Sequence, residues 1–186
     1  MLIEAKEIQL KNGQRVTLKS PSGKDAGALL EHIRKTSAET HFMSRYPEEI
    51  SLTQEEEEQF LENILQDADN FMISAFMDGE LVGNVSVHCI QDLLKYRHRA
   101  GMGISVCKKV WNMGLGTILV KEALSVAAQT SFEQIELGVF SDNRRALHLY
   151  EKVGFQRVGR IPGAFKLKDG TYCDEIQMVY RRCPRE

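Results

Sequence analysis

The fold is decided by Trp111-Asn112-Met113-Gly114-Leu115-Gly116-Thr117, which joins an apolar strand pattern at 103–106 to apolar residues at helical spacing over 118–129. Glycines at a strand-to-helix junction let backbone N–H groups approach a ligand without a Cβ in the way. The first turn of a helix also carries unpaired N–H groups and a partial positive charge. The stretch therefore predicts a site for a phosphate or pyrophosphate, with an ordinary helix start as the alternative.

A second informative stretch, residues 139–155, reads Val-Phe-Ser-Asp-Asn-Arg-Arg-Ala-Leu-His-Leu-Tyr-Glu-Lys-Val-Gly-Phe. Within it, Asn143, Ala146 and Tyr150 are spaced i, i+3 and i+7, so a helix places them along one face. Gly154 then ends the helix and Phe155 begins the next strand.

Together, the two stretches resemble the GNAT superfamily of acyl-coenzyme A dependent N-acyltransferases. The first resembles that family's pyrophosphate motif, Gln/Arg-x-x-Gly-x-Gly/Ala, and the second resembles its motif Asn-x-x-Ala-x-x-Leu-Tyr-x-Lys-x-Gly-Phe. The resemblance covers roughly residues 101–160. It implies an α/β fold in which a mixed, twisted central sheet of about seven strands has helices on both faces. It also implies a splayed pair of parallel strands that binds the cofactor.

Trp111 departs from this pattern, because the pyrophosphate motif has Gln or Arg at its position. Tryptophan supplies no charge, although its backbone N–H stays available to a ligand. Branches that resemble ribosomal-protein or polyamine acetyltransferases carry Trp here, so the departure weakens the resemblance only slightly. Packing under the loop is the alternative role for this side chain.

The rest of the chain alternates strand and helix patterns in the order that the resemblance implies. Thr53 and Glu56 are spaced as a capping box at the start of a helix, on which Phe60, Ile64 and Leu65 form the expected apolar stripe. Another helix is expected from Ser22 to about Lys35. Strands are expected at 6–10, 15–19, 71–77, 81–90, 104–106, 135–140, 155–161 and 172–180.

Composition is consistent with one globular domain over residues 1–186, since 42% of the residues are hydrophobic and 27% are charged. The formal net charge of -2 predicts no attraction to nucleic acid or to an anionic membrane. No apolar run approaches a membrane span in length, and no secretion signal is evident. The four cysteines are widely spread, which argues against zinc and favours reduced thiols in the cytoplasm; they are Cys89, Cys107, Cys173 and Cys183.

The resemblance assigns most contacts with the cofactor, acetyl-CoA, to the backbone. It implies that residues 104–106 pair with the pantetheine arm, Val106 N–H polarising the acyl carbonyl, and that residues 111–117 surround the pyrophosphate. Asn143 is expected to bind the pantetheine near the thioester, and its alternative role is a helix N-cap. The expected cofactor-binding residues are Ile104, Ser105, Val106, Trp111, Asn112, Met113, Gly114, Leu115, Gly116, Thr117 and Asn143.

Tyr150 is the expected catalytic residue. In the resemblance its hydroxyl protonates or hydrogen-bonds the departing thiolate, where charge appears only as the thioester breaks. Several family members place a basic glutamate five residues before the motif asparagine, but this chain has Gly138 there. Glu136, on the same strand face, is the candidate base through a water, and His88 is the other candidate.

The acceptor side of the site is less defined. Phe42, Tyr46 and Phe165 are candidate walls, and Asp174-Glu175 would either orient an amine or pair with basic residues. The acidic helix after Thr53 would favour a cationic acceptor if it borders the site, and is otherwise a solvated face.

The sequence therefore predicts an N-acetyltransferase that moves an acetyl group from acetyl-CoA to a primary amine of a small molecule or peptide by direct attack. No metal, nucleic acid or membrane is expected to take part, and the family resemblance is compatible with a homodimer. The alternative is a non-catalytic acyl-CoA sensor or interaction module, against which the presence of Tyr150 argues.

Overall fold

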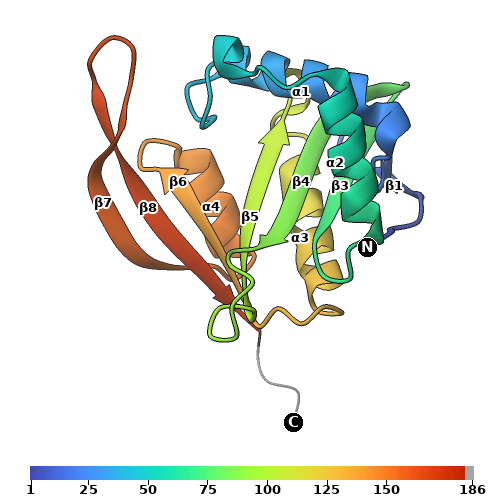
Figure 1. The fold of residues 1–186 in the computed structure, drawn as a ribbon. Coiled ribbons are helices and arrows are strands. Elements are labelled where there is room, and N and C mark those ends of the chain that lie inside the picture. Colours follow the sequence, from blue (N-terminus) through green and yellow to red (C-terminus); the bar gives the residue numbers. More distant parts are fainter. Residues whose placement is uncertain (183–186) are drawn as a thin grey trace.

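The computed structural model describes residues 1–182, in which eight strands form one sheet in the order β1-β2-β3-β4-β5-β6-β8-β7 (Figure 1). Neighbouring strands are antiparallel except β5 and β6, which run parallel. The mixed α/β sheet is confirmed, with eight strands where about seven were predicted. The strands are β1 Lys6–Gln9, β2 Arg15–Lys19, β3 Phe71–Met77, β4 Glu80–Cys89, β5 Arg99–Val106, β6 Gln134–Phe140, β7 Gln156–Lys166 and β8 Tyr172–Arg181.

Helices cover both faces of the sheet, as predicted (Figure 1). On one face, α1 (Ala26–Glu39) packs on α2 (Gln54–Gln66) and on β4. On the other face, α3 (Leu115–Ala127) packs against β4 and β5, and α4 (Arg144–Lys152) buries its apolar side in the larger core cluster. Among residues 1–182, no helix combines the length and apolar character needed to cross a membrane. Single 3-10 turns lie at Gly23–Asp25, Pro47–Glu49 and Lys108–Val110.

The predicted capping box of α2 is present. Glu56 N–H donates to Thr53 Oγ1 at 3.2 Å, and Thr53 N–H donates to a Glu56 carboxylate oxygen at 2.9 Å. The predicted apolar stripe of α2 was partly wrong, because Phe60 is 48% exposed whereas Leu61 is fully buried. The contact of α2 with α1 turns Glu57, Leu61 and Ile64 inward, at the helical spacing i, i+4 and i+7.

The parallel strands β5 and β6 separate after three residue pairs, and this separation creates the site. Residues 99–101 of β5 pair with residues 134–136 of β6, and no pairing follows in the described residues. On their outer sides both strands remain fully paired, β5 with β4 as far as Val106 and β6 with β8 as far as Phe140. Residues 102–106 and 137–140 therefore present unpaired backbone edges to each other across a gap, as the predicted splayed pair requires.

Candidate active site

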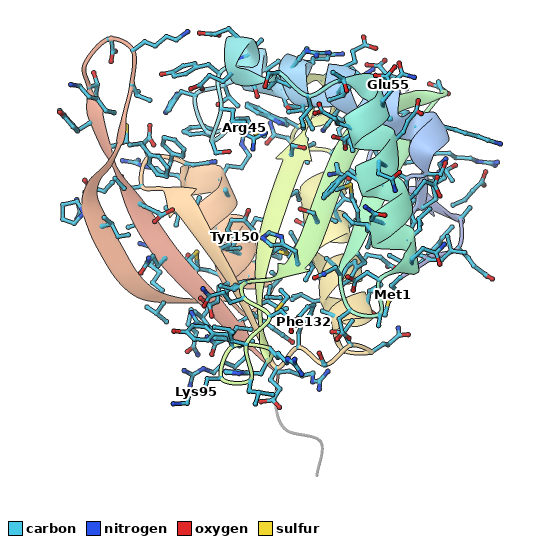
Figure 2. All side chains as sticks on the ribbon, viewed as in Figure 1. Met1, Arg45, Glu55, Lys95, Phe132 and Tyr150 are labelled. Carbon is cyan, nitrogen blue, oxygen red and sulfur yellow. The ribbon has the colours of Figure 1, made fainter. Side chains whose placement is uncertain are left out.

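A cavity of about 700 Å³ opens where β5 and β6 separate. Its walls come from the end of α1 and the loop after it, from β4, β5 and β6, from the first turn of α3 and from α4. Figure 2 shows Tyr150 beside the opening between β5 and β6, and Arg45 near its upper rim on the loop that joins α1 to α2. The residues predicted for the site that line this cavity are Ile104, Ser105, Val106, Trp111, Asn112, Gly114, Leu115, Gly116, Thr117, Asn143 and Tyr150.

The glycine loop ends in a left-handed residue that starts α3. Gly114 is the N-cap with φ of +92°, and its carbonyl accepts the helical bond from Ile118 N–H at 3.1 Å. The N–H groups that follow Gly114 have no partner within the helix. A Cβ on Gly116 would lie 3.1 Å from Leu149 Cδ1, so glycine also lets α3 approach α4. The loop thus has the geometry of an anion-binding helix terminus.

The turn between β1 and β2 packs against this loop and adds a cation to it. Lys11 N–H donates to the Met113 carbonyl at 3.2 Å, and the Lys11 side chain passes over Gly114 and lines the cavity. Asn12 Nδ2 lies 3.3 Å from Met113 Sδ. Met113 therefore holds the turn in place instead of lining the cavity itself.

Trp111 contacts both the end of β5 and a second cation, Arg145. Its Nε1–H donates to the Val106 carbonyl at 2.8 Å, which accounts for one backbone group on the gap side of β5. The Arg145 guanidinium lies 4.0 Å from the centre of the indole ring and also lines the cavity. Arg145 thus supplies from α4 the positive charge that Trp111 lacks.

Asn143 is the N-cap of α4 and lies at the cavity. Its Oδ1 accepts a hydrogen bond from Ala146 N–H at 3.2 Å, so the capping role is present. Asn143 also lines the cavity, so the predicted contact with the cofactor is sterically open to it and stays a prediction.

Tyr150 lies in the cavity wall on α4 and is only 7% exposed. Within residues 1–182 its hydroxyl makes no hydrogen bond, and its ring lies 5.6 Å from that of Phe155. Burial raises the pKa of the Tyr150 hydroxyl well above its ordinary value. The phenol is therefore protonated at neutral pH and is free to donate its proton to a group in the cavity.

The two candidate bases from the sequence do not reach the cavity. Glu136 lies opposite Gly101 at the closed end of the β5–β6 pair, where Arg99 binds both of its carboxylate oxygens at 2.5 and 2.8 Å. These hydrogen bonds from Arg99 lower the pKa of Glu136. The His88 ring lies over Gly101 and is likewise absent from the cavity wall.

The side of the cavity toward α1 is walled by aromatic rings. Phe140 stacks on Phe165 with ring centres 3.8 Å apart and meets Phe42 at 6.0 Å. Of the residues predicted to wall the acceptor side, Phe42 lines the cavity. Phe165 does not line it and instead stacks on Phe140, which does. No residue of the acidic helix α2 lines it, so the structure does not bring that helix to the acceptor side.

A polar bridge joins the α1–α2 loop to the tip of the β7–β8 hairpin. Lys168 N–H donates to Tyr46 Oη at 3.0 Å, and the Lys168 ammonium lies 4.2 Å from the centre of the Tyr46 ring. The same ammonium pairs with Glu48. Tyr46 therefore links two loops near the cavity instead of lining it.

A buried histidine links α1 to the gap. His32 is 2% exposed, with Nε2 2.8 Å from Ser105 Oγ and Nδ1 3.4 Å from Cys107 Sγ. Burial lowers the pKa of His32 to about 4. The sequence offered no signal for this contact, because it joins a helix to a strand far along the chain.

One group of possible metal ligands lies near the cavity rim. Donor atoms of His41, Asp142 and Cys173 all lie within 4.8 Å of one another, and His41 Nε2 is 2.8 Å from Asp142 Oδ2. His41 and Asp142 are exposed and already pair with each other, which accounts for their closeness. We therefore assign no metal role to this group of three residues. Cys183 lies outside the described residues.

A family model described as "Acetyltransferase (GNAT) family" matches residues 31–155. L-amino acid N-acetyltransferase AaaT of Escherichia coli (strain K12) is 31% identical over 106 residues, which are 56% of this chain and 64% of that protein. The chain thus spans less than two thirds of this curated relative.

Among solved structures, the acetyltransferase of GNAT family from Streptococcus pneumoniae is 31% identical with a TM-score of 0.85, over 90% of this chain and 99% of that chain. The phosphinothricin acetyltransferase from Sinorhizobium meliloti, solved in complex with AcCoA, has a TM-score of 0.77 over 89% of this chain and 88% of that chain. At 17% identity, the likeness shows a shared fold.

Proposed function

Because the chain belongs to the acetyltransferase (GNAT) family, we propose that it transfers an acetyl group from acetyl-CoA to a primary amine. The observation that carries this proposal is the gap between β5 and β6. It has a glycine loop at the start of α3 on one side and the unpaired Tyr150 hydroxyl on the other. The glycine loop suits the phosphates of an acyl-CoA, and the hydroxyl suits the thiolate that departs when its thioester breaks.

The residues around the gap suit acetyl-CoA as the acyl donor. Unpaired backbone groups of residues 102–106 and 137–140 are free to pair with the amides of the pantetheine arm, as an added strand would. The N-terminus of α3 suits the pyrophosphate, and Lys11 and Arg145 add positive charge beside it.

The end of β5 supplies a donor for the acyl oxygen. Cys107 N–H donates to the Val82 carbonyl at 2.9 Å, on the β4 side of the strand. Because successive backbone groups of a strand point in opposite directions, Val106 N–H faces the gap. In our proposal this N–H stabilises the negative charge that develops on the acyl oxygen during attack by the amine. Tyr150 then donates its proton to the departing thiolate.

For the acceptor we propose a small amine that also carries a carboxylate. One curated relative is named for an acceptor of this class, the L-amino acid N-acetyltransferase AaaT. Arg45 supports the same class in this chain, because it lines the cavity and forms no ion pair with any residue of 1–182 (Figure 2). Arginine binds carboxylates through paired N–H groups.

Thiol release from acetyl-CoA tests the proposal directly. The panel contains amino acids, their carboxamides, polyamines, aminoglycosides and peptides with free N-termini. We expect release with amino acids, weaker release with the matched carboxamides, and loss of that preference in Arg45→Gln. Absence of acetyl-CoA binding in calorimetry would refute the proposal, and tight binding without release from any amine would favour the non-catalytic sensor.

A further inference from the structure

Glu175 of β8 lies on the acceptor-side face of the sheet. It is the register partner of Phe140 in the antiparallel pair of β6 and β8, and directly opposite residues project to the same face. Gly138, two residues before Phe140, lies on that face too. Both Gly138 and Phe140 line the cavity.

The Glu175 side chain occupies the space above Gly138. A Cβ built on Gly138 would overlap Glu175 Oε1, and it would lie 2.6 Å from Cδ and 3.1 Å from Cγ of the same residue. Any side chain at position 138 would therefore displace this carboxylate. Glu175 is not itself among the residues that line the cavity, but its carboxylate lies against Gly138, which lines it and has no side chain.

The Glu175 carboxylate has no lysine or arginine partner among residues 1–182. It is partly buried and forms no ion pair or hydrogen bond with any other residue of 1–182. Its neighbour Asp174 differs, because it pairs with Arg160 and accepts a hydrogen bond from Gly163 N–H at 2.7 Å. A partly buried carboxylate without a partner attracts a cation, and an acceptor amine enters the site as an ammonium.

The surroundings of Glu175 hold few other charges. Gly138 and Phe140 face it from β6, and Ile161 is its register partner on β7. Along its own strand face, the nearest titratable side chain is Cys173, beside which lies the His41–Asp142 pair. No lysine or arginine is among these groups, so a bound ammonium would be the principal positive charge near Glu175.

We propose that Glu175 binds the ammonium group of the acceptor and takes its proton as the general base. This inference rests on the proposed acetyl transfer. The ammonium gives one proton to Glu175, and the neutral amine forms the new C–N bond as the C–S bond breaks. The thiolate takes its proton from Tyr150, and the nitrogen's second proton restores Tyr150. The sum is amine cation plus acetyl-CoA giving N-acetyl product, free thiol and one proton released from Glu175 to water.

The test is the pH dependence of kcat/KM for thiol release, measured with an amine that the wild-type protein accepts. We expect Glu175→Gln to lower kcat/KM at pH 7 by about 10²- to 10⁴-fold. The deficit is expected to shrink as the pH rises toward the pKa of the free amine, while the Kd for acetyl-CoA stays unchanged. Asp174→Asn is the matched control, and we expect it to keep the wild-type pH profile.

A second variant pair separates a chemical role from a structural one. Glu175→Ala clears the space above Gly138, and Gly138→Glu in that background returns a carboxylate to the same place from β6. Recovery of the rate at pH 7 in the double variant would support the inference. If Glu175→Gln keeps the wild-type pH profile, or loses the same factor in kcat/KM at every pH, the role of Glu175 is refuted while the proposed acetyl transfer stands. A wild-type protein that releases no thiol with any amine would instead refute the proposed acetyl transfer, and this inference with it.

Discussion

Acidification should destabilise this fold, and His32 should contribute a separable part of the loss. Its side chain is 2% exposed and contacts Ser105 and Cys107, and burial lowers its pKa from 6.5 to about 4. In the unfolded chain the imidazole takes up a proton below about pH 6.5. The folded chain therefore binds fewer protons than the unfolded chain between these two pKa values, and folding loses free energy as the pH falls through that window.

The size of the loss follows from the two pKa values. One unit of pKa difference corresponds to about 1.4 kcal/mol, so the whole window amounts to about 3 kcal/mol. At pH 5, where the unfolded imidazole is almost fully protonated and the folded one is mostly neutral, the loss is about 2 kcal/mol. Above pH 6.5 His32 causes little loss of unfolding free energy, and below pH 4 the loss reaches its full size.

Urea unfolding at a series of pH values measures this loss. His32→Gln is the matched variant, because glutamine is polar and stays neutral over the whole range. Carboxylates such as Asp25, whose pKa is lowered in the fold, act equally in both proteins. We expect the unfolding free energy of the wild-type protein to fall by about 2 kcal/mol more than that of His32→Gln between pH 7.5 and pH 5. Parallel pH curves for the two proteins would refute the reasoning.

Three further predictions concern the proposed chemistry. Tyr150→Phe is expected to lower kcat by about 10- to 1000-fold with an unchanged Kd for acetyl-CoA. Thiol release measures kcat, and calorimetry measures the Kd. Gly114→Glu and Gly114→Gln share a strain of about 1–2 kcal/mol at this left-handed residue. Because only the glutamate repels the pyrophosphate, we expect it to bind acetyl-CoA at least about tenfold more weakly than the glutamine variant, and equal affinities would contradict the placement of the site. Trp111→Phe keeps an aromatic ring beneath Arg145 but loses the hydrogen bond that Nε1–H donates to the Val106 carbonyl. Loss of that hydrogen bond costs about 1 kcal/mol, so we expect calorimetry to give about a fivefold higher Kd for acetyl-CoA.

Features that depend on neighbouring residues in the chain could be predicted from the sequence. The glycine loop, the N-cap at Asn143 and the capping box of α2 are local, because each is set by residues within one helical turn. The phase of α2 was harder to predict, since Phe60 and Leu61 are adjacent apolar residues. Only the contact with α1 decides that Leu61 faces inward.

Features that join distant parts of the chain could not be predicted. The strand alternation that made Glu136 a candidate was sound, but the sequence does not reveal where β5 and β6 stop pairing. The structure shows that Glu136 lies on the paired side of that point. Arg145 against Trp111, and Glu175 above Gly138, likewise depend on how α4 and β8 pack, which no local pattern encodes.

The separation of β5 and β6 leaves two strand edges in the interior of one sheet, and this has a thermodynamic consequence. The five strands on one side and the three on the other are joined in the sheet by three residue pairs. A ligand that pairs with both edges binds the folded chain alone, because the unfolded chain has no gap. Each tenfold rise in free ligand above its Kd then adds about 1.4 kcal/mol to the free energy of unfolding. The fraction of unfolded protein would therefore fall as the concentration of acetyl-CoA, the ligand that we propose, rises.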